Sequence, residues 1–235
     1  MVSQENFTDK KTITDYTISL GPACRPAHYL REYGLRRCSN PLDWMMSYSL
    51  ESVVELFKTE FSTFFADRKE REDRIGKFRC VEDVRNGMIS IHSFSLDEDL
   101  DSSYNKFSEI MSKRFLRMKK CISESEHVLF LSNRHDSFEA FEKFLAEMHN
   151  LFDCNFTCLN VRHSDECYES SKKISERLEF VEIAFPDIHP NGADASNSDF
   201  WIGNPKGWEK VMQRISLSPK FSELDLAKIE DKNQK

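Results

Sequence analysis

The later part of the chain alternates short apolar runs with helical patterns, and this alternation limits the possible folds more than any other feature. Between the runs, apolar residues recur every three to four positions, as in the helix predicted from Phe138 to Phe152. Strands that alternate with helices of this length form parallel sheets whose two faces are covered by helices. We therefore predict an α/β fold with a mostly parallel central sheet of about five strands and helices on both faces. The predicted strands include the runs at 16–20, 128–132, 156–161 and 180–185.

Further elements precede and follow these strands. One-sided apolar patterns predict long helices from Ser49 to Phe65 and from Tyr104 to Ile122, and Met88 to Phe94 is a strand candidate. Shorter helices are predicted near 26–33, near 165–177 and around Trp208. We expect one α/β domain between two terminal segments: a flexible arm at 1–13, the domain at 14–217 and a polar, partly helical tail at 218–235.

Composition limits the class of protein and its partners. The chain has 235 residues and a net charge of −7, so we expect neither nucleic acid nor an anionic membrane as a partner. It contains no apolar run long enough to span a bilayer and no signal-peptide pattern, which favours a cytoplasmic protein. The seven cysteines are odd in number and irregularly spaced, so we expect free thiols. The oligomeric state does not follow from this sequence.

The main functional candidate is Cys24, which lies in a turn between a predicted strand and a predicted helix. A helix N-terminus stabilises a thiolate, and Arg25 would act in the same direction, so we expect a lowered pKa for the Cys24 thiol. Gly21 allows a substrate to approach the backbone closely, and nearby N–H groups could form an oxyanion hole. The alternative is a small buried cysteine that fills a tight turn.

Several motifs around this turn resemble a bacterial family known as putative papain-like cysteine peptidases. They are Ser19-Leu20-Gly21 followed by Cys24, then Gly34-Leu35-Arg36, Asn40-Pro41-Leu42-Asp43-Trp44, and a Gly-containing strand that ends in His92-Ser93-Phe94. A further strand ends in Asn133-Arg134. The match is good over residues 15–135, although Leu42 replaces the usual Phe and Ser93 replaces an acid.

The resemblance implies a cysteine-dependent hydrolase or acyl-type transferase with Cys24 as nucleophile and His92 as base. His92 follows Cys24 in the chain, as in papain-like enzymes, and could take the thiol proton. Asp43 could orient His92, bind a cationic group or cap the helix that begins near Ser47, and Asn133 occupies the place of the residue that orients the histidine. Gly21, Arg25, Trp44 and Arg134 are candidates for binding a small-molecule, peptide or glycan substrate, with Arg134 suited to an anionic group.

Two other interpretations remain open. Asp187 and His189 are similar to the Asp/His pair of flavodoxin-like esterases and acyltransferases, with Cys24 or Ser19 as nucleophile. The chain could also be a non-catalytic, ligand-binding accessory protein. The spacing of Cys154, Cys158, His163 and Cys167 departs from that of a zinc knuckle, so we expect no metal and no other cofactor. Whichever of His92 and His189 lies within hydrogen-bond reach of the Cys24 sulfur should decide between the two enzyme interpretations. If neither does, the ligand-binding interpretation gains support.

Overall fold

The computed structural model describes residues 11–192 and 196–220. The predictions for residues 1–10 and for 221–235 therefore lie outside the described residues. The helices are α1 (Arg25–Glu32), α2 (Leu50–Lys58), α3 (Leu100–Glu124), α4 (Phe138–Leu151) and α5 (Pro205–Met212), with a short 3₁₀ helix η1 (Phe200–Ile202). The strands are β1 (Thr12–Thr14), β2 (Tyr16–Ser19), β3 (Met45–Met46), β4 (Arg68–Ile75), β5 (Phe78–Asp83), β6 (Ile89–Ser95), β7 (His127–Ser132), β8 (Asn155–His163), β9 (Tyr168–Lys173), β10 (Leu178–Phe185) and β11 (Ile215–Leu217).

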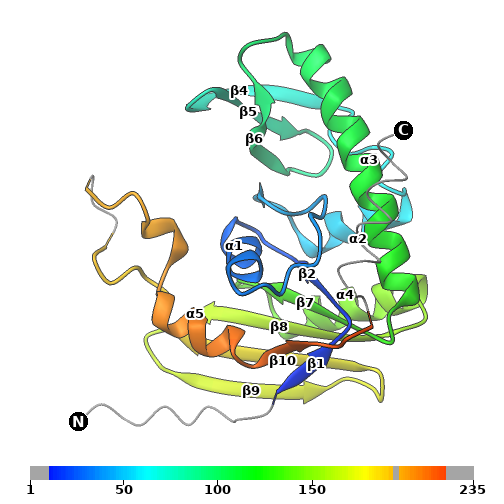
Figure 1. Ribbon diagram of the computed structural model, residues 1–235, viewed down its shortest axis with the longest axis vertical. Helices are drawn as coiled ribbons and strands as arrows, with labels where there is room; N and C mark the ends of the chain where they lie inside the picture. The colour runs from blue at the N-terminus through cyan, green and yellow to red at the C-terminus, as the bar shows by residue number, and fades with distance from the viewer. Residues whose placement is uncertain (1–10, 193–195, 221–235) are drawn as a thin grey trace.

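The central sheet has five strands in the order β2-β7-β8-β10-β9 (Figure 1). Strands β2, β7, β8 and β10 run parallel to one another, whereas β9 pairs antiparallel with β10. The predicted α/β class is confirmed. The sheet is mixed, however, so the prediction of a mostly parallel central sheet is not confirmed. The predicted helix at 165–177 is wrong, because Tyr168–Lys173 forms the edge strand β9.

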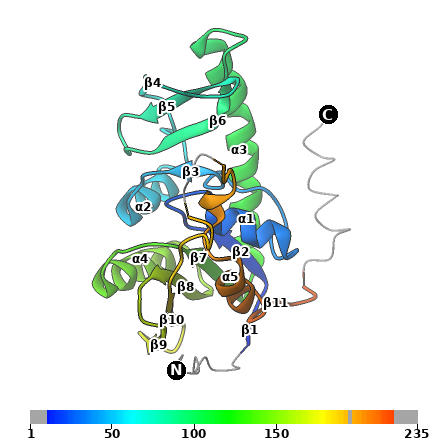
Figure 2. The same ribbon diagram turned by 90° about the vertical axis from the view of Figure 1, so that its left-hand side faces the viewer.

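Helices cover both faces of this sheet, with α2 and α4 on one side and α1 and α5 on the other (Figure 2). The parallel strands supply apolar side chains to both faces, as buried strands of this kind do. On the face of α1 and α5, Leu129, Leu131 and Val161 pack with Leu30 and Trp208. The opposite face holds a larger, phenylalanine-rich core, which includes Phe130, Phe156, Phe180, Phe141, Phe144, Phe57, Phe61 and Phe115.

A second sheet was not predicted as a unit. Its four strands follow the order β3-β6-β5-β4 and pair antiparallel, and it packs beside one end of the long helix α3 (Figure 1). Only its β6 segment was predicted, as the run from Met88 to Phe94. The pairing of β5 with β6 shifts register between Arg79 and Val81, which face Phe94 and Ser90 respectively. The residues between Ser90 and Phe94, including His92, therefore lie in a β-bulge.

The ends of the described chain meet beside the central sheet. Strand β1 pairs in parallel with β11, and Thr12 lies opposite Ile215. Asp15, directly after β1, accepts hydrogen bonds from the backbone N–H groups of Glu126 and His127 at 2.7 and 3.2 Å. Its carboxylate also accepts one from the hydroxyl of Ser218. Together these contacts fix both ends of the described domain to the start of β7.

Candidate functional site

Cys24 lies in the turn between β2 and α1, at the edge of the sheet where the parallel strands end. It is the N-cap residue of α1, as the sequence predicts, and its own backbone is helical with φ −68° and ψ −20°. Ligand sites of open α/β sheets lie at the carboxyl ends of the strands, which is the edge where Cys24 is found. Cys24 is partly exposed, whereas five other cysteines are buried and Cys167 is exposed.

Arg134, which follows β7, connects the Cys24 turn to the loop before α2. Its Nε donates to the carbonyl of Leu20 at 2.9 Å and its Nη1 to the carbonyl of Tyr48 at 2.8 Å. The guanidinium also lies over the Tyr48 ring, 4.8 Å from its centroid. Arg134 is only 2% exposed. An arginine so deeply buried and so bonded positions the backbone around the site.

Tyr48 packs directly against the turn. A β-carbon placed on Gly21 would fall 2.3 Å from the Tyr48 hydroxyl oxygen, so only glycine fits there. Ser47, its neighbour, donates its backbone N–H to the carbonyl of Pro22 at 3.1 Å. Burial is the main cause that raises the pKa of Tyr48 well above its usual range, and a charge on Cys24 would add to this effect. The hydroxyl therefore stays protonated and lies within electrostatic range of Cys24.

Several buried polar atoms of β2, the loop before α2 and Arg134 lack a hydrogen-bond partner among the described residues. They include Ser19 Oγ, Asn40 Nδ2, Asp43 Oδ1, Tyr48 Oη and Arg134 Nη2. Buried polar groups are nearly always hydrogen-bonded, and an unpaired one costs about 1–3 kcal/mol. Such a concentration of unpaired groups is typical of a binding or catalytic site.

The predicted site residue Asp43 is buried and held by two contacts. Its Oδ2 accepts from Arg36 Nη1 at 2.9 Å and from the backbone N–H of Asn40 at 3.0 Å. Burial raises the pKa of Asp43, although Asn40 and Arg36 oppose this shift. The next residue, Trp44, packs under the guanidinium of Arg31 on α1, 5.1 Å from the ring centroid. Asp43 and Trp44 thus connect the loop before α2 to α1 and the segment after it.

The Arg25 side chain binds residues of the segment after β10. Its Nη1 lies 2.5 Å from Asp187 Oδ2, and its Nε donates to the carbonyl of Trp201 at 2.8 Å. The predicted site residue Asn133 joins the same network, because its amide donates to the Asp187 carboxylate at 3.3 Å and to the carbonyl of Val161 at 2.8 Å. The Arg25 charge is therefore neutralised by a carboxylate.

The expectation of a lowered pKa for Cys24 is contradicted. Burial of the sulfur raises the pKa of the Cys24 thiol, and the backbone hydrogen bond at the helix start offsets only part of this shift. The paired guanidinium of Arg25 does not contribute to the shift. At neutral pH the resting residue is a thiol, so a nucleophilic Cys24 requires a base.

No hydrogen bond joins Cys24 to a histidine within the part of the chain that the structure describes. His92 lies exposed on the bulge of β6 and contacts the Phe78 ring edge-on, with 6.4 Å between centroids. Burial of part of its ring lowers the pKa of His92, so it is neutral at pH 7. His189 Nδ1 accepts from Asn197 Nδ2 at 2.9 Å, whereas Asp187 Oδ1 accepts from Trp208 Nε1 at 2.9 Å. Asp187 and His189 thus bind different partners.

Sequence reasoning missed two residues, His28 and Tyr48. His28 lies one helical turn after Cys24, and its backbone N–H donates to the carbonyl of Cys24 at 2.9 Å. Residues four apart on a helix have β-carbons about 5–6 Å from each other. Its buried Nδ1 lacks a partner among the described residues, and burial lowers the pKa of its ring. The Cys-x₃-His spacing before Gly34 could have indicated His28, whereas no local pattern indicates Tyr48.

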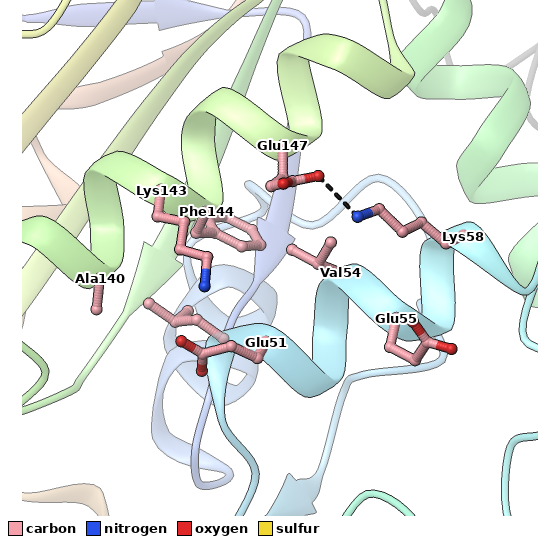
Figure 3. Close-up of a pocket in the computed structure, with 9 residues that line it drawn as sticks. Glu51, Val54, Glu55, Lys58, Ala140, Lys143, Phe144 and Glu147 are labelled. Carbon is pink, nitrogen blue, oxygen red and sulfur yellow. Dashed lines mark ion pairs between the residues drawn. The ribbon is translucent and has the colours of Figure 1, made fainter.

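Two other regions are candidates for a functional site: the cysteines near β8 and a groove between α2 and α4. Cys154 and Cys158 are buried core thiols, and the described residues include no cluster of three or more metal-ligating side chains. A groove of about 240 Å³ lies between α2 and α4, with Val54 and Phe144 at its base and the ion pair Lys58–Glu147 across it (Figure 3). Within residues 11–192 and 196–220, no helix is both long enough and apolar enough to cross a bilayer.

Comparison with known proteins relates the chain to one family. An uncharacterized protein of Acanthamoeba polyphaga mimivirus is 23% identical over 221 residues, which cover 83% of this chain and 96% of the viral protein. No solved structure matches the chain significantly. Residues 15–165, which include Cys24, Tyr48, His92 and Arg134, match the family described as "Putative papain-like cysteine peptidase". The match spans more than half of the sequence, and the chain therefore belongs to this family.

Proposed function

We propose that the protein is a cysteine-dependent hydrolase or acyl-type transferase with Cys24 as its nucleophile. The observation that carries this proposal is the position of Cys24: it is partly exposed, at the carboxyl ends of the parallel strands, beside buried polar groups without partners. Membership of the family supports the same chemistry. Five of the other thiols are buried in the protein interior, and Cys167 lies exposed just before the edge strand β9.

The proposed reaction begins with removal of the Cys24 proton by a neutral imidazole. The sulfur then attacks the carbonyl carbon of an acyl substrate and forms a C–S bond, while the carbonyl electrons move to oxygen. Collapse of this tetrahedral intermediate expels the leaving group, which takes the proton from the imidazolium. Water, or another acceptor in a transferase, then releases the acyl group from the sulfur.

His92 is the base that we propose, and His28 is the competing assignment. Strand β6 pairs with β3 through Ser90 and Met45, and the residues after β3 contact the Cys24 turn. Bulges such as the one that holds His92 are common beside active sites, because they change the direction of a side chain. His28 is closer to Cys24 along the helix, and its Nδ1 is unpaired among the described residues. Both rings have a lowered pKa, so both are neutral bases at pH 7.

The remaining site residues receive supporting roles in this proposal. Gly21 leaves the space that the Tyr48 ring and hydroxyl occupy, and Asp43 and Trp44 fix the loop that carries Tyr48. Arg134 Nη1 lies 3.5 Å from Asp136 Oδ2, so its charge is paired, but its Nη2 has no partner among the described residues and would favour a substrate with an anionic group. Arg25 and Asn133 hold the segment after β10 against the start of α1.

Site-resolved acylation tests the proposal. The purified protein is incubated with p-nitrophenyl acetate, and acetylation of each cysteine is followed by peptide mass spectrometry. We expect early acetylation of Cys24, complete loss of this signal in Cys24→Ala and no effect on it in the matched control Cys167→Ala. His92→Ala should slow acetylation of Cys24 by about 100-fold or more if His92 is the base, and His189→Ala should leave it unchanged.

Two results would change the assignment. A loss of reactivity in His28→Ala with normal reactivity in His92→Ala would make His28 the base. If Cys24 reacts no faster than an exposed thiol and no histidine variant alters its rate, the site is not catalytic. The protein would then be a ligand-binding accessory protein, and the unpaired polar groups would serve to hold its ligand.

A further inference from the structure

The hydroxyl of Tyr48 is a buried donor whose proton has no acceptor among the described residues. Tyr48 is 4% exposed, and its Oη has no hydrogen-bond partner there. Burial raises the pKa of this hydroxyl and the nearby Arg134 guanidinium partly opposes the rise, although no hydrogen bond of normal distance and angle joins the two groups. A guanidinium can only donate, so Arg134 could never accept the Tyr48 proton. The fold therefore retains an unsatisfied donor, which costs about 1–3 kcal/mol.

This donor lies beside the turn that carries the nucleophile. The Tyr48 hydroxyl faces Gly21, the residue at which an added β-carbon would come within 2.3 Å of Oη. Three further contacts fix the arrangement: Ser47 N–H to the carbonyl of Pro22 at 3.1 Å, and the two bonds from Arg134 to the carbonyls of Leu20 and Tyr48. Both the turn that carries Cys24 and the loop that carries Tyr48 are therefore bonded to the same buried side chain.

We propose that the Tyr48 hydroxyl is the oxyanion donor of the Cys24 site. This inference rests on the proposed function and adds a catalytic residue to it. When the Cys24 sulfur bonds to the acyl carbon, the carbonyl oxygen gains a negative charge, and Tyr48 Oη–H donates a hydrogen bond to that oxygen without losing its proton. The proton stays on Tyr48 through the collapse of the intermediate, in which the C–S bond remains and the bond to the leaving group breaks.

The surroundings of Tyr48 suit this role. A donor that is already fixed and lacks a competing acceptor stabilises a developing charge without a cost of reorganisation. Arg134 binds the backbone carbonyl of the tyrosine, and its guanidinium, which is paired with Asp136 at 3.5 Å, lies over the Tyr48 ring. The loop before α2 thereby supplies a side-chain donor at a site where the helix N-terminus supplies backbone N–H groups.

Two probes with different chemistry at the same sulfur test the proposal. Attack on p-nitrophenyl acetate forms an oxyanion, whereas alkylation by iodoacetamide displaces iodide and forms none. In Tyr48→Phe we expect acetylation of Cys24 to slow by about 100-fold and alkylation of Cys24 to remain within about twofold. The melting temperature should not fall, because the variant removes an unpaired polar atom.

Tyr16→Phe is the matched control, because Tyr16 is fully buried and its hydroxyl is bonded to Asn40 and Cys38. This control should lower the melting temperature and leave acetylation of Cys24 unchanged. Equal slowing of acetylation and alkylation in Tyr48→Phe would overturn the oxyanion role, since Tyr48 would then act on the thiol itself. Unchanged acetylation would overturn it as well. Absence of acetylation at Cys24 in the unmodified protein would instead refute the proposed function.

Discussion

The guanidinium of Arg25 and the carboxylate of Asp187 form an ion pair at 2.5 Å that joins the first residue of α1 to the segment after β10. Asp187 also accepts hydrogen bonds from Trp208 Nε1 at 2.9 Å and from the backbone N–H of Asn204 at 3.1 Å. The side chain of Asp187 is fully buried, and that of Arg25 is 20% exposed. The pair therefore anchors the start of α1, one residue after the proposed nucleophile.

We expect Asp187→Asn to destabilise the protein by about 2–4 kcal/mol. Removing one partner of a buried ion pair leaves the other charge uncompensated, and the partial exposure of Arg25 reduces the cost below that of a fully buried pair. Chemical denaturation measures the change in free energy of unfolding. The matched control is Asp153→Asn, which removes an exposed ion pair with Arg177 and should have no measurable effect. Equal stability of Asp187→Asn and the unmodified protein would show that the pair does not anchor α1.

Gly21→Ala should be more damaging than Gly34→Ala. Both glycines have positive φ, 46° and 64°, so alanine is strained at either position by about 1–2 kcal/mol. Only at Gly21 does the new methyl group also collide with the Tyr48 ring and hydroxyl, whereas Gly34 has nothing within 4 Å. Thermal denaturation of both variants, with iodoacetamide labelling of Cys24, measures the difference. Equal losses of stability and unchanged labelling would mean that Tyr48 moves aside at no cost.

The strands of the central sheet could be predicted because their side chains are buried on both faces. The predicted runs at 128–132 and 156–161 fall within β7 and β8, and every residue of these two runs is buried. Strand β4 reads Arg-Lys-Glu-Arg-Glu-Asp-Arg-Ile and was missed, because an edge strand is held by backbone pairing and needs no apolar face. The same reason explains why the polar edge strand β9 was predicted as a helix.

The position of Cys24 could also be predicted, since the Gly21-Pro22 pair marks the end of a strand and Pro26 the start of a helix. The chemical environment of Cys24 could not be predicted from the sequence. Arg25 was expected to act on Cys24, but its partner Asp187 lies 162 positions away in the chain. Tyr48 is held beside the turn by Arg134, which donates hydrogen bonds to the carbonyls of both Leu20 and Tyr48. Contacts between distant segments of this kind leave no local pattern in a single sequence.

Asp15 should make the stability of the protein depend on acid pH. Burial alone raises the pKa of Asp15, but hydrogen bonds from Ser218, Glu126 and His127 and the charge of Lys220 lower it overall. A carboxyl with a lowered pKa in the folded state stabilises the fold above its unfolded pKa of about 3.9, and this contribution disappears as the pH falls through the folded value. The difference in unfolding free energy between the unmodified protein and Asp15→Asn should therefore be larger at pH 6 than at pH 3. Urea denaturation at the two values tests this, and a difference independent of pH would contradict it.

The alkylation of Cys24 should have an alkaline midpoint. Burial raises the pKa of the Cys24 thiol, and iodoacetamide reacts with the thiolate, so the rate should rise with pH through a value above the reference of about 8.5. Free cysteine in the same buffers provides the reference curve. The pKa of Cys38 is shifted in the opposite direction, to about 6. The largest cause is a hydrogen bond from Cys121, and a hydrogen bond from Tyr16 adds to it.

Labelling must therefore be resolved by residue. Because Cys38 is only 8% exposed, it should react slowly in the folded protein despite its lowered pKa, and readily in urea. Cys24, which is partly exposed, should already react in the folded protein, at a rate that increases from pH 7 to pH 10. A midpoint for Cys24 below that of free cysteine would mean that the N-terminus of α1 outweighs burial. If the midpoint also lay below pH 7, the resting site would hold a thiolate, and the histidine would act only as the acid that protonates the leaving group.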